Sequence, residues 1–546
     1  MSETISAGEA LVCTLEQYGV SAMYGIISIH NLPIADAVGR RGTLRFVPAR
    51  GEAGAVSMAD AHGRFSGLGV ALTSTGAGAG NAVGALLEAA SAATPLLHIT
   101  GQVEKAYLDN DCGFIHEVRD QLGFLRASCK AALRVHSAQQ LVATLHRAIQ
   151  LAQTPPCGPV SLEIPIDIQN SPLPLSVLTA PVRPLRPATP ELAVVDGLAS
   201  RLRQARRPLL WVGSGARQAV DAVRALADAG VTVISSTHGR GILPDSHPRS
   251  LRAFHTSPSV AALIARCDLT LIVGSRLRSN ETRSWTLALP EPRLQIDLDP
   301  GAGSRNYPAD GVYNYDSQAM LNALVEVYRP TEQPDPAWDV EIASAVQQAE
   351  TQLREQCGVY SALNDAVAAA LPPQGIVVRD ITISGSLWGS RLLPASECGN
   401  RVHSLAGAIG MGLPLAIGSA LANPQRKVLA LVGDGGLALG LGELATLVQE
   451  QANVTLLVMN DGGYGVMRGI QDNHFGGRQY YNRLHTPDFS LLAQAMGLAA
   501  WRIDDAADFA PVLQTALAQQ GPSLVEVNMH RIGELYFAGP PQKSLY

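Results

Sequence analysis

The segment spanning residues 427–464 constrains the fold more than any other part of this chain. It opens with an unbroken apolar run at 428–432, which has the length and character of a strand buried on both faces of a parallel sheet. Leucines at helical spacing follow, and a second apolar run at 454–459 ends in Asn460 and Asp461. This order predicts a strand–helix–strand unit with a right-handed crossover and two parallel strands.

Acidic residues follow both predicted strands. Asp434 stands in the glycine-rich sequence Gly433-Asp434-Gly435-Gly436, and Asp461 closes the second strand. Because ligands of open α/β sheets bind beyond the carboxyl ends of the strands, the two carboxylates could meet there around a hard cation such as Mg²⁺ or Ca²⁺. An ordinary glycine–aspartate turn is the alternative for the first sequence, but it leaves the second aspartate unexplained. Together the two aspartates predict a metal-bridged diphosphate site.

These features resemble the thiamine diphosphate motif of the acetolactate synthase, 2-oxo acid decarboxylase and benzaldehyde lyase superfamily. That motif usually ends in Asn-Asn, whereas Asp461 stands at its last position here. The resemblance implies that Asp434, Asp461 and the carbonyl of Gly463 hold Mg²⁺, and that Tyr464 lies near the diphosphate. The backbone N–H groups beside the first aspartate can approach the same diphosphate; they belong to Gly433, Gly435 and Gly436.

An activating glutamate is expected early in the chain. Glu52 falls in the first turn of a predicted helix, where the helix dipole favours a carboxylate whether or not it has a function. The surrounding residues 50–55 and 58–60 resemble the family's segment bearing the glutamate that hydrogen-bonds N1′ of the aminopyrimidine ring, although Gly51 replaces the usual histidine. The resemblance therefore implies that Glu52 binds the cofactor and tunes its chemistry.

Two histidines are further catalytic candidates. His30 matches a histidine found in benzaldehyde lyase and in enzymes similar to 2-ketoarginine decarboxylase. His116 stands where acetolactate synthase and benzaldehyde lyase carry glutamine. Without the resemblance, each would be interpreted as an ordinary loop histidine. With it, we expect both to transfer protons, because histidine titrates near neutral pH.

Two more segments resemble cofactor-binding loops of the family. The hydroxyl-rich residues 380–388 resemble its second diphosphate-contacting loop, and the candidates there are Thr382, Ser384 and Gly385. Residues 407–414 resemble the segment that bends the cofactor into a V shape. Ile409 takes the position of the wedging residue, and the carbonyl of Gly407 would meet the 4′-amino group. Bending brings the reacting groups together, which makes the deprotonation intramolecular.

The expected fold class is α/β, with three Rossmann-like or flavodoxin-like domains built on parallel sheets. Proline-rich stretches mark the boundaries. The expected parts are an N-terminal pyrimidine-binding domain (1–170), a linker (171–190), a middle domain (191–329), a second linker (330–345), a C-terminal diphosphate-binding domain (346–530) and a tail (531–546). In some relatives the middle domain binds FAD, which is possible but not favoured here.

Composition excludes several other classes of protein. The 546 residues are too many for one core, and the net charge of −6 comes without a basic run of the kind that tracks nucleic acid. The N-terminus lacks a signal-peptide pattern, and charged residues interrupt the long apolar stretches, so we expect no membrane span and a cytoplasmic location. The seven cysteines are dispersed without a CxxC pair, which is typical of reduced packing residues.

The resemblance implies a non-oxidative decarboxylase of a 2-oxo acid, working through ylide and enamine intermediates. The alternatives are a carboligase or lyase that forms or cleaves acyloins from 2-oxo acids or aldehydes, and a catalytically silent subunit that binds thiamine diphosphate. Because Glu52 and residues 433–464 lie in different domains, the family pattern places each active site between two subunits. We therefore expect a homodimer or homotetramer.

Overall fold

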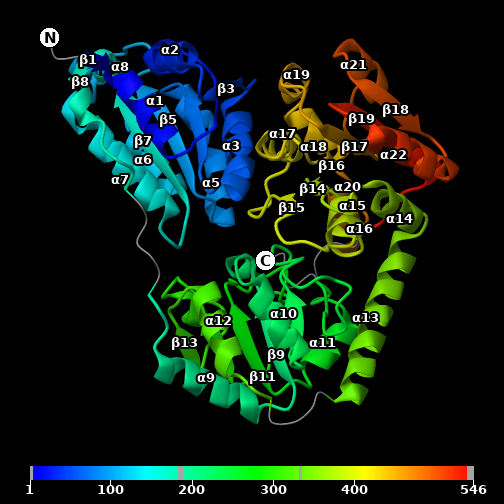
Figure 1. The fold of residues 1–546 in the computed structure, drawn as a ribbon. Coiled ribbons are helices and arrows are strands. Elements are labelled where there is room, and N and C mark those ends of the chain that lie inside the picture. Colours follow the sequence, from blue (N-terminus) through cyan, green and yellow to red (C-terminus); the bar gives the residue numbers. More distant parts are fainter. Residues whose placement is uncertain (1–3, 183–187, 331–334, 538–546) are drawn as a thin grey trace.

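The computed structural model describes residues 4–182, 188–330 and 335–537 and contains three α/β domains (Figure 1). Each domain is built on one sheet whose paired strands are all parallel, which confirms the predicted fold class. The N-terminal and C-terminal domains lie side by side, and the middle domain lies beneath both of them.

The N-terminal sheet has the strand order β3-β2-β4-β5-β7-β6. Its strands are β2 (Ala22–Gly25), β3 (Arg45–Pro48), β4 (Gly69–Thr73), β5 (Leu96–Gln102), β6 (Ala131–Arg134) and β7 (Pro159–Pro165). The helices are α1 (Ala7–Gln17), α2 (Leu32–Arg41), α3 (Glu52–Ser66), α4 (Ala77–Asn81), α5 (Val83–Ala92), α6 (Gln121–Ser128), α7 (Leu141–Gln153) and α8 (Ile166–Asn170). The neighbouring strands β2 and β4 are separated in sequence by β3, so the chain reverses its direction of travel across the sheet at this point, where ligands commonly bind in open α/β sheets.

The middle sheet has the order β10-β9-β11-β12-β13. Its elements are α9 (Leu192–Gln204), β9 (Pro208–Val212), α10 (Val220–Asp228), β10 (Thr232–Ser235), α11 (Pro258–Ile264), β11 (Leu269–Val273), β12 (Arg293–Ile296), β13 (Gly311–Tyr313) and α12 (Ser317–Val327). Its strands are buried throughout except for the edge strand β13 and the first residue of β12, as expected of a sheet covered on both faces.

The C-terminal sheet has the order β15-β14-β16-β17-β19-β18. Its strands are β14 (Ile376–Arg379), β15 (Arg401–His403), β16 (Val428–Gly433), β17 (Val454–Asn460), β18 (Ala499–Ile503) and β19 (Ser523–Asn528). The helices are α14 (Tyr360–Ala370), α15 (Ile383–Ser386), α16 (Trp388–Arg391), α17 (Gly412–Ala422), α18 (Asp434–Leu439), α19 (Glu443–Gln449), α20 (Gly465–His474), α21 (Phe489–Ala495), α22 (Phe509–Ala518) and α23 (Met529–Ile532). The predicted strand–helix–strand unit is confirmed, because β16 pairs with β17 in parallel from Val428 opposite Val454 to Gly433 opposite Met459.

The segments predicted as linkers carry some regular structure. In the first, β8 (Pro172–Pro174) pairs antiparallel with β1 (Thr4–Ser6). In the second, the long helix α13 (Pro336–Cys357) begins at a proline whose N-cap residue, Asp335, accepts a hydrogen bond from the backbone N–H of Ala337 at 2.9 Å. An aspartate cap followed by proline is a strong helix start, so proline here opens a helix and does not mark an extended segment. The predicted tail lies outside the described residues from 538 onwards.

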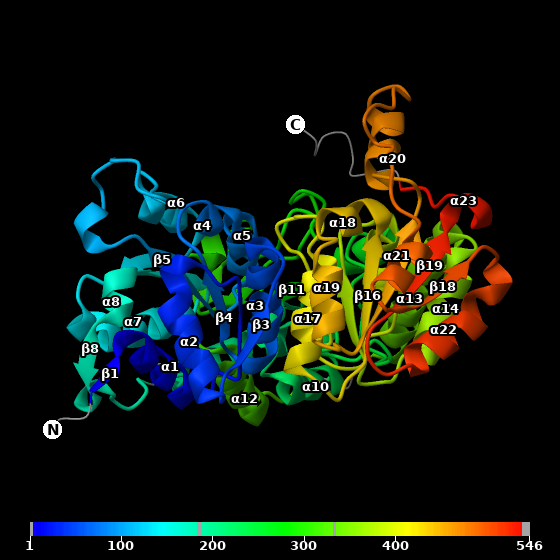
Figure 2. The same cartoon turned by 90° about the horizontal axis from the view of Figure 1, so that it is seen from above.

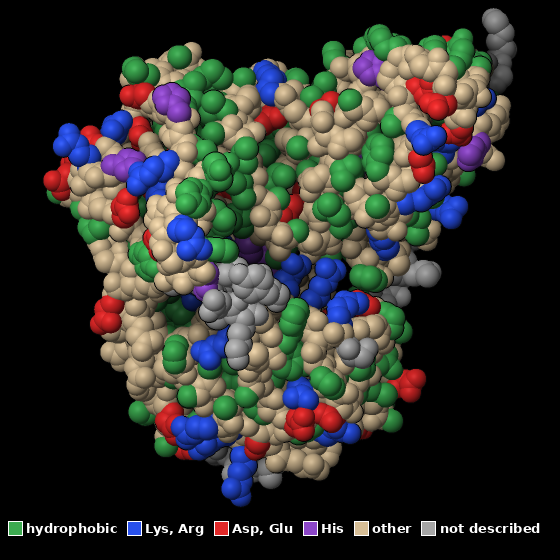
Figure 3. Space-filling model, turned by 180° about the vertical axis from the view of Figure 1, so that it is seen from behind, with side chains coloured by type: hydrophobic (Ala, Val, Ile, Leu, Met, Phe, Trp, Pro, Cys, Tyr) green, Lys and Arg blue, Asp and Glu red, His purple; other side chains and the backbone are tan. Residues whose placement is uncertain are grey.

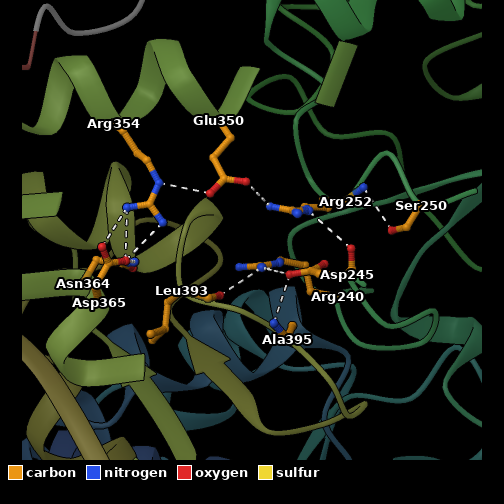
Figure 4. A network of polar contacts seen from close by, with 10 residues as sticks. All are labelled: Arg240, Asp245, Ser250, Arg252, Glu350, Arg354, Asn364, Asp365, Leu393 and Ala395. Carbon is orange, nitrogen blue, oxygen red and sulfur yellow. Dashed lines mark hydrogen bonds and ion pairs between the residues drawn. The ribbon is translucent and has the colours of Figure 1, made fainter. Parts of the chain in front are cut away.

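Polar contacts hold α13 between the middle and C-terminal domains (Figure 4). Glu350 of α13 pairs with Arg252 of the middle domain at 2.7 Å, and Arg354 pairs with Asp365 of α14 at 3.0 Å. A second contact joins the domains directly, since Arg240 donates to the carbonyl of Leu393 at 3.0 Å. These contacts join the middle domain to the C-terminal domain.

Helices α3 and α17 join the N-terminal and C-terminal domains. Val56 and Met58 of α3 belong to one buried cluster with Leu413 and Ile417 of α17. The helix backbones meet at Gly418, where an added Cβ would lie 2.1 Å from the carbonyl oxygen of Met58. Within the described chain, no helix is long and apolar enough to cross a membrane.

We expect Gly418→Ala to lower the free energy of unfolding by about 1–3 kcal/mol, because the extra methyl overpacks the contact between α17 and α3. Gly39→Ala in α2 is the matched control, since no atom lies within 4 Å of its added Cβ. That control should raise stability by about 0.5–1 kcal/mol, because alanine favours a helix over glycine. Urea unfolding of both variants measures the difference, and equal midpoints would contradict the close approach of the two helices.

Candidate active site

The carboxyl ends of β14, β16 and β17 open onto a cavity of about 370 Å³. Eight residues predicted to contact the cofactor line it: Thr382, Ser384, Ile409, Gly433, Gly436, Asp461, Gly463 and Tyr464. Four others lie beside these in the chain but are not part of the wall, namely Gly385, Gly407, Asp434 and Gly435. The structure thus gathers segments from Thr382 to Tyr464, 82 positions apart in sequence, at one edge of the sheet.

Asp434 and Asp461 meet at this edge, as predicted. Asp434 is fully buried, and its Oδ1 accepts the backbone N–H of Asp461 at 3.4 Å. Its Oδ2 is also buried and has no hydrogen-bond partner among the described residues. A buried carboxylate oxygen without a partner is costly, and a hard cation would satisfy it.

Burial makes it unfavourable for Asp434 and Asp461 to carry negative charge. Burial raises the pKa of Asp461 to about 7, although Arg468 opposes the shift. Burial also raises the pKa of Asp434. Within the part of the chain that the structure describes, no group of three histidine, cysteine or acidic side chains is arranged to hold a metal. A cation here would therefore need backbone oxygen as well, and the carbonyl of Gly463 fits that requirement.

Arg468 is a site residue that sequence reasoning left unassigned. It lies in α20, is buried, and its Nη2 stands 2.7 Å from Oδ2 of Asp461. The same nitrogen donates to the carbonyl oxygen of Asp461 at 3.0 Å. One feature of the sequence could have pointed to this arginine. Asp461 replaces the asparagine that usually ends the family motif, and an added buried negative charge requires a cation nearby.

Two glycines allow the strand ends to approach each other. An added Cβ on Gly435 would lie 2.9 Å from both the carbonyl oxygen of Gly463 and the ring of Tyr464. Gly463 itself has φ +142°, and its added Cβ would lie 2.2 Å from the carbonyl oxygen of Asn482. Neither position tolerates a side chain without local rearrangement.

Three further predicted residues of the C-terminal domain are a partly buried isoleucine and two hydroxyl side chains. Ile409 is only partly buried and lines the cavity, so it is not an ordinary core residue. Thr382 caps the short helix α15 by accepting the N–H of Gly385 at 2.7 Å. The hydroxyl of Ser384 is buried and lacks a partner among the described residues, which leaves it free to bind a ligand group.

The predicted residues of the N-terminal domain gather at the carboxyl edge of its own sheet. Glu52 begins α3 directly after β3, and its Oε2 accepts the side-chain N–H of Asn81 at 3.2 Å. An added Cβ on Gly78 would lie 2.9 Å from Oε1 of Glu52. The glycine-rich segment after β4 therefore makes room for the carboxylate and orients it.

His30 and His116 form a pair near that edge, with ring centroids 5.2 Å apart. His30 is buried on a 3₁₀ turn (Ile29–Asn31), whereas His116 is exposed on the loop before α6. Burial lowers the pKa of His30, and the neighbouring His116 lowers it further. The sequence identified both histidines, but only the structure shows that they touch.

The predicted residues of the N-terminal domain are not part of the cavity wall in the C-terminal domain. Among the described residues, those that line the cavity lie between Ile381 and Met529, and none comes from the N-terminal domain. The loop before α6 and helix α20 project from the same face of the molecule (Figure 2). Glu52 and the two histidines therefore do not line the cavity of their own chain.

A second cavity, of about 290 Å³, lies where the middle domain meets the other two. Its wall includes Gly213 and Gly274, which follow β9 and β11, and Lys and Arg side chains gather around this junction (Figure 3). The arginines of the wall are Arg217, Arg276, Arg278 and Arg305. The wall also carries Glu281, Asp297 and Asp299, and Asp299 pairs with Arg305 at 2.7 Å, so charges of both signs line this cavity.

We expect Arg468→Met to lower the free energy of unfolding by about 1–3 kcal/mol, because it leaves the buried Asp461 carboxyl group without its hydrogen-bonding partner. Arg40→Met is the control, since Arg40 pairs with Asp36 on the exposed surface of α2 and its loss should change unfolding very little. Thermal and urea unfolding measure both variants. Equal losses of stability would show that the Asp461 contact is no stronger than a surface ion pair.

Comparison with known proteins agrees with this division into three domains. Residues 5–124 match the family model "Thiamine pyrophosphate enzyme, N-terminal TPP binding domain", residues 195–324 match the central domain, and residues 384–527 match the C-terminal TPP binding domain.

Several relatives are similar over nearly the whole chain. A probable 2-ketoarginine decarboxylase (AruI) of Pseudomonas aeruginosa is 30% identical over 96% of this chain and 94% of its own length. The large subunit of acetolactate synthase isozyme 1 of Escherichia coli is 28% identical over 98% of this chain and 96% of its own length. The large subunit of isozyme 2 of the same organism is 28% identical over 99% and 98% respectively. The chain therefore belongs to the thiamine pyrophosphate enzyme family and is a thiamine diphosphate-dependent enzyme that acts on carbon–carbon bonds.

Proposed function

We propose that this protein is a magnesium-dependent, non-oxidative decarboxylase that converts a 2-oxo acid into an aldehyde. The observation that carries the proposal is the contact between buried His30 and exposed His116. Protonation of the carbon that loses carbon dioxide yields an aldehyde, whereas carboligation requires that carbon to attack a second carbonyl group. The edge-to-face contact would let a proton pass from exposed His116 to buried His30, and such a transfer favours the first outcome. The similarity to the 2-ketoarginine decarboxylase supports it.

The C-terminal cavity would hold the cofactor. Asp434, Asp461 and the carbonyl of Gly463 would bind Mg²⁺, and the unpartnered Oδ2 of Asp434 supports that assignment. The backbone around Gly433, Gly435 and Gly436 and the polar groups of Thr382, Ser384 and Gly385 would contact the diphosphate, with Tyr464 beside it. Ile409 would separate the two rings, and the carbonyl of Gly407 would accept from the amino group. When bound, thiamine diphosphate supplies the carbon nucleophile and the electron sink.

Glu52 would hold a proton at the aminopyrimidine ring. Its carboxylate is oriented by Asn81 at 3.2 Å, and the absence of a side chain at Gly78 lets it approach the loop after β4. His30 would be neutral at pH 7, because burial and the neighbouring His116 lower its pKa. A neutral imidazole can accept a proton from His116 on one side and donate one to the substrate carbon on the other.

The positions of Glu52 and the two histidines outside the cavity wall support an active site shared between subunits. Since the cavity lacks any wall residue from the N-terminal domain, Glu52 and the histidines would complete the cavity of a second subunit. We therefore propose a homodimer, or a homotetramer built from such dimers, with the active sites between subunits.

A carboligase or lyase is the second candidate, and the likeness to the acetolactate synthase large subunits favours it. The presence of His116 in place of glutamine weighs against it. A catalytically silent subunit is the third candidate. Its case rests on Gly51 and Asp461, which depart from the family pattern, but Glu52 is retained.

Incubation with a panel of 2-oxo acids, thiamine diphosphate and Mg²⁺ should release carbon dioxide and give aldehydes identified by mass. Glu52→Gln should lower turnover by at least about 100-fold, the lower range for loss of a general acid–base group. Acyloin products would favour the carboligase, and absorbance in the flavin bands would favour an oxidase with FAD in the middle domain. Undiminished turnover in Glu52→Gln, or no turnover in the unmodified enzyme despite bound cofactor, would refute the proposal.

Chelation provides an independent test of the metal assignment. Excess EDTA should remove Mg²⁺, thiamine diphosphate and activity together, because the cation would neutralise both the aspartates and the diphosphate. EDTA already saturated with Mg²⁺ is the control and should leave the enzyme active. Asp434→Asn should retain less cofactor after gel filtration than the unmodified enzyme. Cofactor that stays bound after complete removal of the metal would contradict the role of the two aspartates.

A further inference from the structure

The loop at residues 404–411, between β15 and α17, carries Ile409 and has no regular structure of its own. A buried glutamate from another domain holds its backbone. Glu88 of α5, only 4% exposed, accepts the N–H groups of Leu405 at 2.7 Å and Ala406 at 2.9 Å through Oε2. Its Oε1 accepts the N–H of Ala408 at 2.7 Å. One carboxylate of the N-terminal domain thus binds three N–H groups of the C-terminal domain.

A second buried carboxylate holds the other end of the same loop. Asp380, which follows β14, accepts the N–H of Gly410 at 3.0 Å and the N–H of Gly412 at 3.1 Å. The N–H groups immediately before and after Ile409 are therefore both bound by carboxylates. Hydrogen bonds to ionised acceptors are stronger than neutral ones, so the backbone of Ile409 is fixed from both sides.

The C-terminal domain makes the reverse contact. Glu443 of α19, also 4% exposed, accepts the N–H groups of Arg50 at 3.0 Å and Gly51 at 3.1 Å. These residues directly precede Glu52. An added Cβ on Gly54 would lie 2.1 Å from Oε1 of Glu443. The first turn of α3 therefore packs directly against the Glu443 carboxylate.

The middle domain takes part through Arg278. Its guanidinium donates to the carbonyl oxygen of Leu405 at 3.1 Å and to that of Ser91 at 2.6 Å. Ser91 lies in α5, the helix that also carries Glu88, so one arginine ties the loop to that helix. The loop is consequently held by side chains of all three domains.

We infer that Glu88 and Glu443 are reciprocal positioning residues, each supplied by one cofactor-binding domain to fix the active segment of the other. Glu88 sets the place of Ile409, and Glu443 sets the place of Glu52. Neither glutamate touches the cavity. This inference rests on the proposed function for the roles of Ile409 and Glu52, but the contacts themselves can be tested without it.

The test is amide hydrogen exchange on the full-length protein without cofactor, followed by kinetics with cofactor. In Glu88→Gln, one acceptor oxygen becomes an N–H donor that faces backbone N–H groups. Exchange at Leu405, Ala406 and Ala408 should therefore become at least tenfold faster. Glu443→Ala should accelerate exchange at Arg50 and Gly51 likewise, because a single oxygen, Oε1, accepts both N–H groups and this substitution removes it. In both variants kcat should fall at least tenfold while KM for the substrate changes less than threefold.

Two further variants distinguish a role of the glutamates in positioning the loops from a general effect on folding. Glu88→Asp keeps the charge on a shorter side chain and should give a smaller acceleration of exchange than Glu88→Gln. Asp268→Asn is the control, because Asp268 of the middle domain likewise accepts two backbone N–H groups, those of Arg206 at 2.8 Å and Arg207 at 2.9 Å, and does not line the cavity. It should alter exchange only at those residues and leave kcat unchanged.

Unchanged exchange at residues 405–408 in a folded Glu88→Gln protein would overturn the inference. So would faster exchange combined with an undiminished kcat in either variant. If the unmodified protein neither binds thiamine diphosphate nor releases carbon dioxide, the proposed function fails, whereas the exchange measurements still decide whether the two glutamates hold the loops.

Discussion

The parallel register of β14, β16 and β17 is the constraint on which the candidate site depends. All three strands are buried on both faces over almost their whole length, so their apolar side chains determine which residues end at the same edge. Asp380, Asp434 and Asp461 then emerge together beyond that edge. A shift of one residue in either pairing would separate these carboxylates along the edge.

The three aspartates at this edge differ in how their charge is satisfied. Asp380 is bound by backbone N–H groups, and Asp461 is paired with Arg468. Asp434 keeps one buried oxygen without a partner among the described residues. Since an unsatisfied buried carboxylate is costly, Asp434 is the aspartate at this edge that most needs a ligand.

The active groups are distributed over domains that hold one another in place. Helices α3 and α17 form a common core, and the side chains at its margin, Glu88 and Glu443, cross from each domain into the other. The middle domain is fastened to both through Arg278 and through α13 (Figure 4). The position of Ile409 therefore depends on contacts far from it in sequence.

The sequence by itself determined the three parallel α/β domains and the meeting of Asp434 with Asp461, because strand periodicity, crossover handedness and glycine placement are local properties. It also identified Glu52, His30 and His116 through the family resemblance, but it did not show how these three side chains lie relative to one another. Only the tertiary structure decided that the two histidines touch, that Arg468 balances Asp461, and that Glu88, which in the sequence merely interrupts an apolar stretch, binds the loop of Ile409. Such partners come from elements brought together by packing between helices and domains, and no local pattern in a single chain specifies which distant charge will meet which backbone group.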